Sequence, residues 1–340
     1  MFTDEIGTAP DAVLIGRLQR EYILPAAAPA RLDGLGGNLA YAAAAFASWG
    51  GQAGLVSRVN ADFPVDRLAR LKELGFKLDG IHPVTDPLDS RFFVAYGEGN
   101  KPNYDNPITH FAERQLPFPP ELFGYQPRQK YCSKTDYLSD SFRVTDMPRP
   151  FLETKIAHIC PIDFISHKIL PSVLKGGMIQ TLTMRACTCY MDPIFWENIR
   201  GLITDLTAFM MTDVQALKLF QGRSVDLWEI AEHLAGYGPE AVLMQTEDGT
   251  TRLYDRLGQK RWILPAYRAR IIDPTGMLDA FDGGFLAGFQ QTHEPLEAAL
   301  YGNISAAIAG EGSGPYFLLE CLPGLKEMRM QVLRQQIIAA

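Results

Sequence analysis

Residues 273–285, which read DPTGMLDAFDGGF, hold the pattern in this chain that is best suited to chemistry. Gly276 precedes two bulky residues, then Asp279, then small and aromatic residues at helical spacing. The first turn of a helix carries unpaired backbone N–H groups and the positive end of the helix dipole, so it suits an anion. An aspartate in the first turn often only balances the dipole. The strand and glycine turn before Asp279 favour a functional role over this one.

Strand and helix patterns alternate around this stretch. Apolar runs predict strands at 11–16, 22–25, 52–59, 90–96, 155–162, 178–184, 186–192, 208–212, 241–246 and 270–273. Helical spacing predicts helices at 36–50, 63–76, 214–220, 225–238 and 278–289. This alternation is typical of an α/β fold with a parallel sheet. We expect one large α/β domain, with a partly irregular surface region within residues 100–150.

Composition limits the partners and the location of the protein. The net charge is −7 and no basic run is present, which argues against a nucleic-acid partner. The first ten residues lack the basic and apolar parts of a signal peptide. Residues 34–57 are uncharged but are interrupted by glycines, so they do not predict a membrane span. We expect a cytoplasmic protein with a small-molecule substrate, no nucleic acid and no membrane partner.

The cysteines and the first glycine loop exclude other chemistry. Five scattered cysteines argue against a disulfide framework, and Cys187 and Cys189 are expected to alternate in a buried strand. The loop GLGGNLA at 34–40 has Leu39 where a dinucleotide-binding loop needs glycine or alanine. The common loop that binds nucleoside triphosphates, G-x-x-x-x-G-K-[ST], is absent from the sequence.

Two segments resemble the signatures of the ribokinase-like (PfkB) carbohydrate kinase family. GGNLAYAAAAFASWG at 36–50 is similar to the N-terminal signature, and IIDPTGMLDAFDGGFLAGF at 271–289 to the C-terminal signature D-T-x-G-A-G-D-x-F-x-x-G. The resemblance implies a doubly wound, mostly parallel α/β sheet with a small β lid. The expected domain covers residues 1–325, with a discontinuous lid near 17–33 and 86–112. Residues 326–340 are expected to form a C-terminal helix packed on this domain.

The resemblance also implies a reaction. Members transfer the γ-phosphate of ATP, with Mg²⁺, to a hydroxymethyl group of a sugar, nucleoside or similar small molecule. Asp279 falls on the catalytic base, and the backbone of Gly276, Met277, Leu278 and Asp279 on the anion hole. In some members the stretch that contains Asp273 helps to bind a monovalent cation. A homodimer through the lid is a further expectation.

The resemblance also gives the expected substrate-binding residues Glu21, Gly36, Gly37 and Asn38. Arg91, in the expected lid strand, is a further substrate-binding candidate, with a solvated strand arginine as the alternative. The expected nucleotide-binding residues are Thr246, Gly249, Thr275 and Gly276.

Several positions depart from the family pattern. The anion hole G-A-G-D reads Gly-Met-Leu-Asp at 276–279, the substrate-binding aspartate is Glu21, and the N-x-x-E motif reads T-x-x-Q at 212–215. Thr246 stands where a glycine is expected at the end of a strand on the nucleotide side. Two interpretations therefore remain open. The chain is either an active kinase, which the retained Asp279 favours, or an impaired ribokinase-fold protein that binds a small ligand without phosphorylating it.

Overall fold

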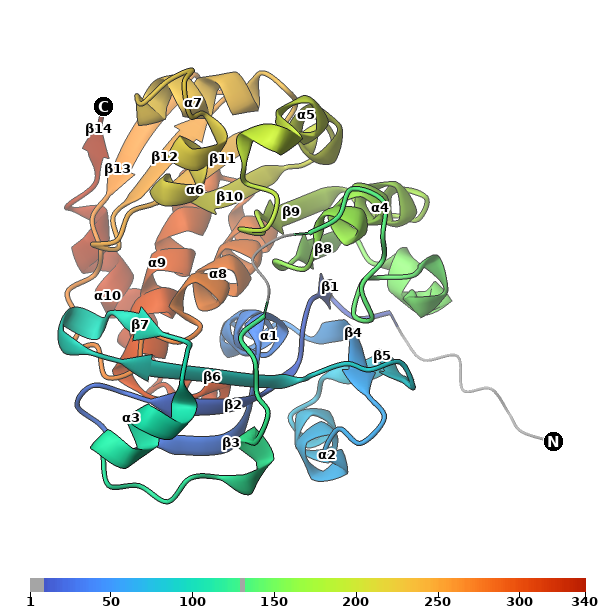
Figure 1. The fold of residues 1–340 in the computed structure, drawn as a ribbon. Coiled ribbons are helices and arrows are strands. Elements are labelled where there is room, and N and C mark those ends of the chain that lie inside the picture. The colour runs from blue at the N-terminus through green and yellow to red at the C-terminus, as the bar shows by residue number, and fades with distance from the viewer. Residues whose placement is uncertain (1–8, 129–131) are drawn as a thin grey trace.

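The computed structural model describes residues 9–128 and 132–340, and these are built around one large sheet (Figure 1). Its ten strands follow the order β14-β13-β12-β11-β10-β9-β8-β1-β4-β5. The parallel strands are β1 (Ala12–Ile15), β4 (Ala53–Asn60), β5 (Lys77–Val84), β8 (Ile156–Ile159), β9 (Thr181–Arg185), β10 (Ala208–Thr212) and β11 (Ala241–Gln245). Antiparallel strands β12 (Thr251–Asp255), β13 (Lys260–Leu264) and β14 (Ile338–Ala339) extend one edge. The predicted mostly parallel α/β sheet is confirmed.

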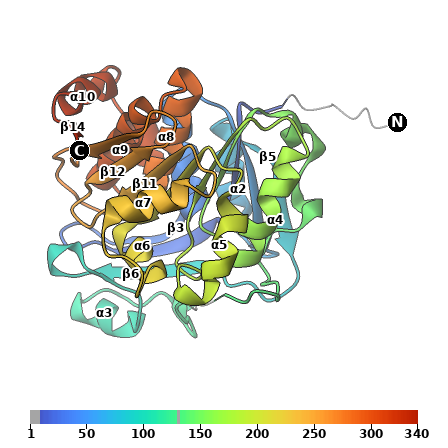
Figure 2. The same ribbon diagram turned by 90° about the horizontal axis from the view of Figure 1, so that it is seen from above.

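Helices cover both faces of this sheet (Figure 2). One face carries α1 (Asn38–Ser48), α2 (Val65–Glu73), α8 (Met277–Thr292), α9 (Pro295–Glu311) and α10 (Leu325–Arg334). The other carries α4 (Phe164–Lys175), α5 (Trp196–Ile203), α6 (Asp213–Leu219) and α7 (Leu227–Ala235). Helix α8 lies close to α1 and α9 because it has glycines at the contacts: a Cβ at Gly283 would overlap the backbone of Ala42, and one at Gly284 would overlap Ser305.

A second, smaller sheet lies beside the main one. Its order is β3 (Arg31–Gly36), β2 (Gln19–Leu24), β6 (Arg91–Tyr96) and β7 (Pro102–Asn103). One face of this small sheet is covered by α3 (Pro107–Glu113) and the chain that follows, where Tyr22, Phe93, Phe111 and Tyr125 are buried together. A homodimer through the lid stays a prediction, and a second copy at this face would meet α3 rather than the strands.

Three local predictions were wrong. Residues 270–273 form no strand, because the N–H groups of Ile272 and Asp273 donate to the carbonyl of Gly310 (2.6 and 3.2 Å). Residues 186–192 also form no strand: β9 ends at Arg185, and a turn follows at 188–190. The last residues do not form only a helix, since α10 is followed by β14, which pairs with β13.

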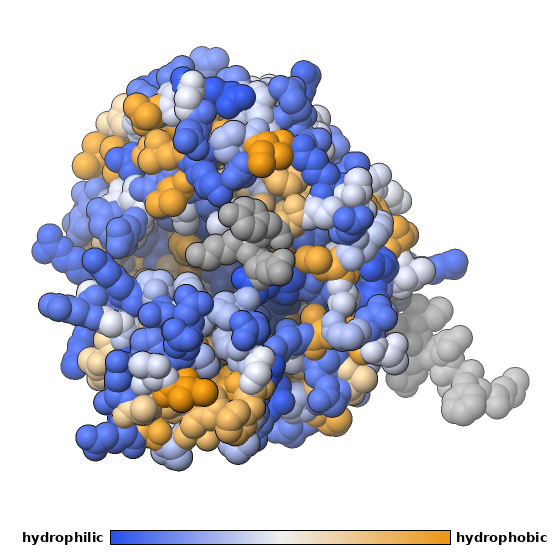
Figure 3. All heavy atoms as spheres, in the orientation of Figure 1, coloured by the Kyte–Doolittle hydropathy of each residue, from blue (hydrophilic) through white to orange (hydrophobic). Residues whose placement is uncertain are grey.

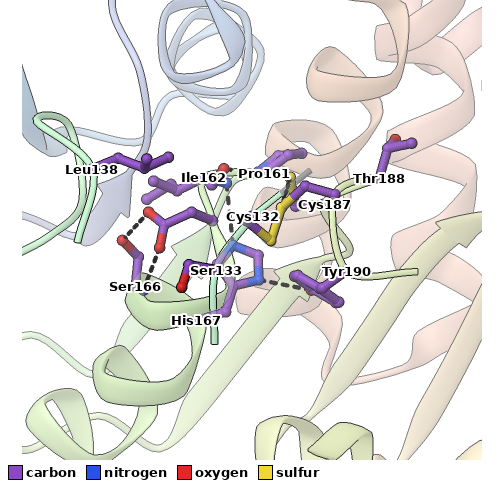
Figure 4. Close-up of a disulfide and its surroundings, with 12 residues drawn as sticks. Cys132, Ser133, Leu138, Pro161, Ile162, Ser166, His167, Cys187, Thr188 and Tyr190 are labelled. Carbon is purple, nitrogen blue, oxygen red and sulfur yellow. Dashed lines mark hydrogen bonds between the residues drawn. A yellow bond between two sulfur atoms is a disulfide. The ribbon is translucent and has the colours of Figure 1, made fainter. Parts of the chain in front are cut away.

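The turn after β9 carries a disulfide that the cysteine pattern did not predict. Cys132 and Cys189 are joined, and the Cys187 thiol lies 3.3 Å from the sulfur of Cys189 (Figure 4). Tyr190 lies next to them and shares a 2.8 Å hydrogen bond with Nδ1 of His167 on α4. The disulfide links the chain that leaves the small-sheet region to the carboxyl end of the main sheet.

Candidate active site

The N-terminus of α8 has the geometry of an anion site. Gly276 precedes the helix with φ 77° and ψ 3°, a left-handed conformation that favours glycine. A Cβ at this position would also overlap the ring of Tyr41. Among the described residues, the backbone N–H groups of Gly276, Leu278 and Asp279 donate no hydrogen bond to protein. Three unpaired donors at the positive end of a sixteen-residue helix can hold a phosphate-like anion.

The Asp279 carboxylate lies in this first turn and is partly exposed. No donor within the described part of the chain forms a hydrogen bond with it. Burial, and next the negative charge of Asp282, raise the pKa of Asp279 to about 7. A carboxyl group with this pKa is a mixture of acid and base near neutral pH, as a general base requires.

Glu21 lies on β2 and is almost fully buried, at 2% exposure. Its carboxylate accepts hydrogen bonds from the N–H of Gly37 (2.7 Å) and the hydroxyl of Tyr41 (3.0 Å). The guanidinium of Arg31, on β3, forms an ion pair with it and donates to the Tyr41 hydroxyl (2.9 Å). Glu21 is also near enough to raise the pKa of Asp279, so the two carboxylates share one region.

Glycines from separate parts of the chain leave room for this cluster of Glu21, Arg31 and Tyr41. A Cβ at Gly36 would overlap the carboxylate of Glu21, and a Cβ at Gly34 would overlap the guanidinium of Arg31. A Cβ at Gly276 would overlap the ring of Tyr41. The glycine loop at 34–37 therefore makes space for protein side chains.

Asn38 begins α1, but both ends of its side chain are already engaged. Its Oδ1 accepts from the N–H of Arg17 (2.8 Å), and its Nδ2 donates to the carbonyl of Pro161 (2.7 Å). Arg17 also pairs with Asp140 at 2.6 Å. Asn38 thus links the residues that follow β1 and β8, and it retains one N–H of Nδ2 beyond these two bonds.

A cavity of about 530 Å³ lies near the glycine loop at residues 34–37. Figure 3 shows that the face of the molecule is hollowed between the small sheet and the main sheet. Of the cavity wall, Gln19 is the strand partner of Gly36, and Asp140 is bonded to Arg17, whose carbonyl lies next to Gly37. The other lining residues are Pro87, Leu88, Asp89, Arg91, Phe92, Tyr104, Asp105, Tyr125, Gln126, Pro127, Arg128, Leu138 and Ser139.

Arg91 lines this cavity but is held at its edge. It pairs with Asp89 at 2.7 Å and donates to the carbonyls of Glu121 (2.5 Å) and Phe123 (3.0 Å). These contacts anchor the segment that covers the small sheet.

The other side of α8 faces a much smaller cavity, of about 70 Å³. Its lining is mostly apolar and includes Met277 and Leu278; Leu278 is 40% exposed. Gly249 reaches it with φ 80°, while the hydroxyl of Thr246 is bonded within its own turn, to Asp248 (2.5 Å) and to the carbonyl of Thr250 (3.1 Å). Only Gly249 of the two predicted nucleotide-binding residues in this turn lines the cavity.

The segment before Gly276 connects the anion site to the small sheet. Thr275 shares a 2.9 Å hydrogen bond with the hydroxyl of Tyr96 on β6. Asp273, 1% exposed, accepts from the N–H of Thr275 (3.0 Å) and the hydroxyl of Ser313 (2.6 Å), and Arg31 donates to that hydroxyl (3.2 Å). Because both carboxylate oxygens are bonded and a guanidinium lies close by, Asp273 is poorly suited to bind a further cation.

Thr212 and Gln215 cap helix α6, and the one carboxylate in this stretch, Asp213, accepts from the N–H of Val214 (2.8 Å). The Thr212 hydroxyl accepts from the N–H of Gln215 (3.2 Å), and Gln215 Oε1 accepts from the N–H of Thr212 (2.9 Å), which is a capping box. The amide nitrogen of Gln215 donates to Thr188 (2.9 Å). The residues described include no group of three or more His, Cys, Asp or Glu able to hold a metal.

Sequence reasoning missed four charged or polar residues that surround the candidate site: Arg31, Tyr41, Arg185 and Asp282. Arg31 and Tyr41 surround Glu21, whereas Arg185 and Asp282 form a buried pair under Asp279. Only Asp282 carried a sequence signal, because a carboxylate within the otherwise apolar run AFDGGF needs a buried partner.

The two sheets and the N-terminus of α8 define the fold of ribokinase-like kinases, and the resemblance found in the sequence is confirmed at this level. A fructokinase from Xylella fastidiosa with bound ATP superposes with a TM-score of 0.68 at 17% identity, covering 96% of this chain and 99% of that one. A nucleoside kinase from Burkholderia thailandensis in complex with inosine gives 0.66 at 16% identity, with 95% and 97% covered.

The sequence itself is similar to a curated protein. A cytidine kinase from Thermococcus kodakarensis is 24% identical over 269 residues, which are 77% of this chain and 82% of that protein. No protein-family model matches the chain. The described residues include no helix long and apolar enough to cross a membrane.

Proposed function

We propose that the protein is a phosphotransferase that moves the γ-phosphate of ATP to a hydroxymethyl group of a nucleoside-type acceptor. The observation that carries the proposal is the unpaired Asp279 carboxylate beside the free N–H groups of the first turn of α8. Phosphoryl transfer needs a positioned base and a site that stabilises negative charge, and this turn offers both.

In the proposed reaction, Asp279 accepts the proton of the acceptor hydroxyl while the hydroxyl oxygen attacks the γ-phosphorus. The bond from the γ-phosphorus to the β–γ bridging oxygen breaks, and ADP leaves. The N–H groups of Gly276, Leu278 and Asp279 hold the oxygens of the transferring phosphate. The bulky residues do not prevent this role, because only their backbone is used. The Met277 side chain packs toward α9: a Cβ placed on Gly310 would come within 2.8 Å of the Met277 sulfur.

The acceptor is proposed from the 530 Å³ cavity and from the curated relative. Phe92, Tyr104 and Tyr125 give the cavity aromatic surfaces against which a planar base can pack. Its charged and amide groups offer hydrogen bonds to the edge of such a base. Glu21 is the strand partner of Phe92 and Gly36 that of Gln19, and both Phe92 and Gln19 line the cavity. Glu21, Gly36 and the adjoining Gly37 are therefore proposed to contact the sugar, with Arg91 at the far edge.

ATP, carrying Mg²⁺ on its phosphates, is the proposed donor, and Thr246, Gly249, Thr275 and Gly276 are its proposed contacts. No magnesium step is assigned to this chain's own residues, because Gln215 replaces a carboxylate and serves as a cap. A monovalent cation at Asp273 is not part of the proposal. The small sheet is proposed to act as a lid, since Tyr96 and Arg31 contact the segments that flank the anion site.

A second candidate function is ligand binding without phosphorylation. The cap at 212–215 and the small apolar cavity beside Leu278 favour it, because both reduce the room and the charge available to a nucleotide.

A phosphotransfer screen separates the two functions. The purified protein is incubated with ATP and Mg²⁺ and with pyrimidine nucleosides, purine nucleosides, pentoses and hexoses, and the phosphorylated products are detected by mass spectrometry. We expect a phosphorylated nucleoside whose formation is lost in Asp279→Asn. Binding of a nucleoside by calorimetry, with no product from any acceptor, would support the second function.

A further inference from the structure

A second carboxylate, Asp282, lies one turn after Asp279 on α8 and is completely buried. Arg185, the last residue of β9, donates from Nε and Nη2 to its two oxygens, at 2.5 Å each. This is the planar, two-bond geometry that arginine forms with a carboxylate. Although burial opposes ionisation, Arg185 and then His158 hold the pKa of Asp282 below its ordinary value.

Strands β8, β9 and β11 of the main sheet all contribute to the surroundings of this pair. Gln245, at the end of β11, accepts from Nη2 of Arg185 (2.9 Å). His158 on β8 places Nε2 3.5 Å from Asp282 and shares a 2.8 Å hydrogen bond with Thr183 on β9. Within the described residues, Nη1 of Arg185 and Nε2 of Gln245 are buried without a partner. The cluster thus has more donors than its acceptors can use.

The pair lies directly beneath the proposed base. Residues three apart on a helix are neighbours on one face, so Asp279 and Asp282 lie one above the other. The titratable and charged groups that face Asp279 are Asp282 from α8, Arg185 from β9, Glu21 from β2 and the thiol of Cys160, which follows β8. His158 contacts Asp282 rather than Asp279.

Stability alone is a weak reason for such a pair. Removing two charges from water is costly, and well-packed apolar residues in place of a buried ion pair are often as stabilising or more so. The residues next to Asp282 on α8 are apolar: Ala280, Phe281 and Gly283. An apolar side chain in place of Asp282 would therefore suit this layer. A role in the chemistry above it explains why charges stand here.

We propose that Arg185 and Asp282 are positioning residues for the reaction: they fix the first two turns of α8 against the sheet and balance the charge around Asp279. Asp282 opposes loss of the Asp279 proton, and Arg185 favours it. Because the two charges cancel, the Asp279 carboxylate stays basic enough to take a proton. It also remains ionised under working conditions. This inference rests on the proposed function, in which Asp279 is the base.

Two variants that break the same contact but differ in charge test the proposal. Asp282→Asn leaves the charge of Arg185 uncompensated, so the acidic limb of the kcat/KM–pH profile should move down by about one pH unit. The double variant Arg185→Met/Asp282→Leu removes both charges and should keep the limb within about 0.3 unit of the parent. Equal behaviour of the two variants would mean that the pair has a structural role alone, and the proposal would be wrong.

A third variant covers the case in which Asp282→Asn does not fold. Arg185→Lys keeps the charge but loses the two-bond geometry, so we expect an unmoved acidic limb with kcat lowered about 10-fold. An unchanged kcat would overturn the positioning role. Asp279→Asn in the parent background separates this failure from failure of the proposed function. If Asp279→Asn keeps full activity, then Asp279 is not the base; if it is inactive while the pair variants behave alike, only the present inference fails.

Discussion

The two sides of the N-terminus of α8 are built differently. On the proposed acceptor side, Glu21, Arg31 and Tyr41 form a dense polar cluster, and Phe92, the strand partner of Glu21, lines a cavity of about 530 Å³. On the nucleotide side, Met277 and Leu278 border a mostly apolar cavity of about 70 Å³, and the polar residues at 212–215 are engaged in capping α6. In the proposed reaction, selection of the acceptor would depend on polar side chains, and binding of the nucleotide on backbone groups and apolar surface. Asp279 is in the same helical turn as Met277 and Leu278 and lies close enough to Glu21 for their charges to interact.

The largest expected effect concerns the residue between the two sides. Asp279→Asn keeps the size of the side chain but cannot accept a proton, so turnover should fall by about 10²–10⁴-fold. Acceptor binding, which depends on the other side chains, should change little. Steady-state kinetics together with calorimetric binding of the acceptor check this. A rate close to that of the parent would show that Asp279 is not the general base.

Next in size is a change on the acceptor side. In Gly36→Ala the new methyl group would overlap the Glu21 carboxylate, so we expect the KM for the acceptor to rise at least about 10-fold and folding stability to fall by about 1–3 kcal/mol. Gly201→Ala on α5 is the matched control, because no atom lies within 4 Å of its new methyl group. That variant should be as stable as the parent or up to about 1 kcal/mol more stable. Equal behaviour of the two variants would contradict the packing argument.

The third prediction concerns pH and stability. The pKa of Asp279 is raised to about 7, whereas in the unfolded chain an aspartate titrates near 4, so the folded state retains a proton that the unfolded state has lost. Stability contributed by this residue is therefore complete below about pH 4 and lost as the pH rises toward 7. Asp279→Asn, which resembles the protonated form, should be more stable than the parent at pH 8, by up to about 4 kcal/mol.

At pH 4 the same variant and the parent should unfold at similar denaturant concentrations. Urea unfolding at the two pH values measures both differences. A stability gain of the same size at pH 4 and pH 8 would show that titration of Asp279 is not its cause.

The smallest effect is expected on the nucleotide side. Gln215→Glu keeps the capping box and supplies a carboxylate, the kind of ligand that Mg²⁺ prefers, so half-maximal activity should need about 2–10-fold less Mg²⁺. Gln221→Glu, an exposed position just after α6, is the control for net charge. If both variants respond alike, the effect belongs to overall charge and the distinction between the two sides loses this support.

Much of the main sheet could be predicted from the sequence, because buried parallel strands read as short apolar runs. Strands β12 and β13 were missed because TRLYD and KRWIL are not apolar runs: they mix charged and apolar residues, as partly exposed antiparallel strands do. The run 270–273 looked like a strand, but its backbone is bonded to Gly310 on α9, thirty-seven or more residues further along the chain. Such long-range contacts leave no local pattern.

The site was predictable where backbone chemistry defines it and not where side-chain pairing does. Gly276 and Asp279 could be found because a helix start has a recognisable sequence. The partners of Glu21 and Asp282 could not, since Arg185 and Asp282 are 97 residues apart and the pairing depends on how β9 packs against α8. The disulfide between Cys132 and Cys189 was missed in the same way, because it joins two irregular segments.

The glycines around Arg31 have a practical consequence for anyone who wishes to redesign the acceptor. Gly34, Gly36 and Gly276 come from two distant segments of the chain. At each of them the Glu21–Arg31–Tyr41 cluster occupies the space that a larger side chain would need. Replacing Arg31 alone with a short side chain would leave a water-filled void in contact with a buried carboxylate. Altered acceptor preference is therefore more accessible through libraries that vary Arg31 together with these glycines than through single-site screening.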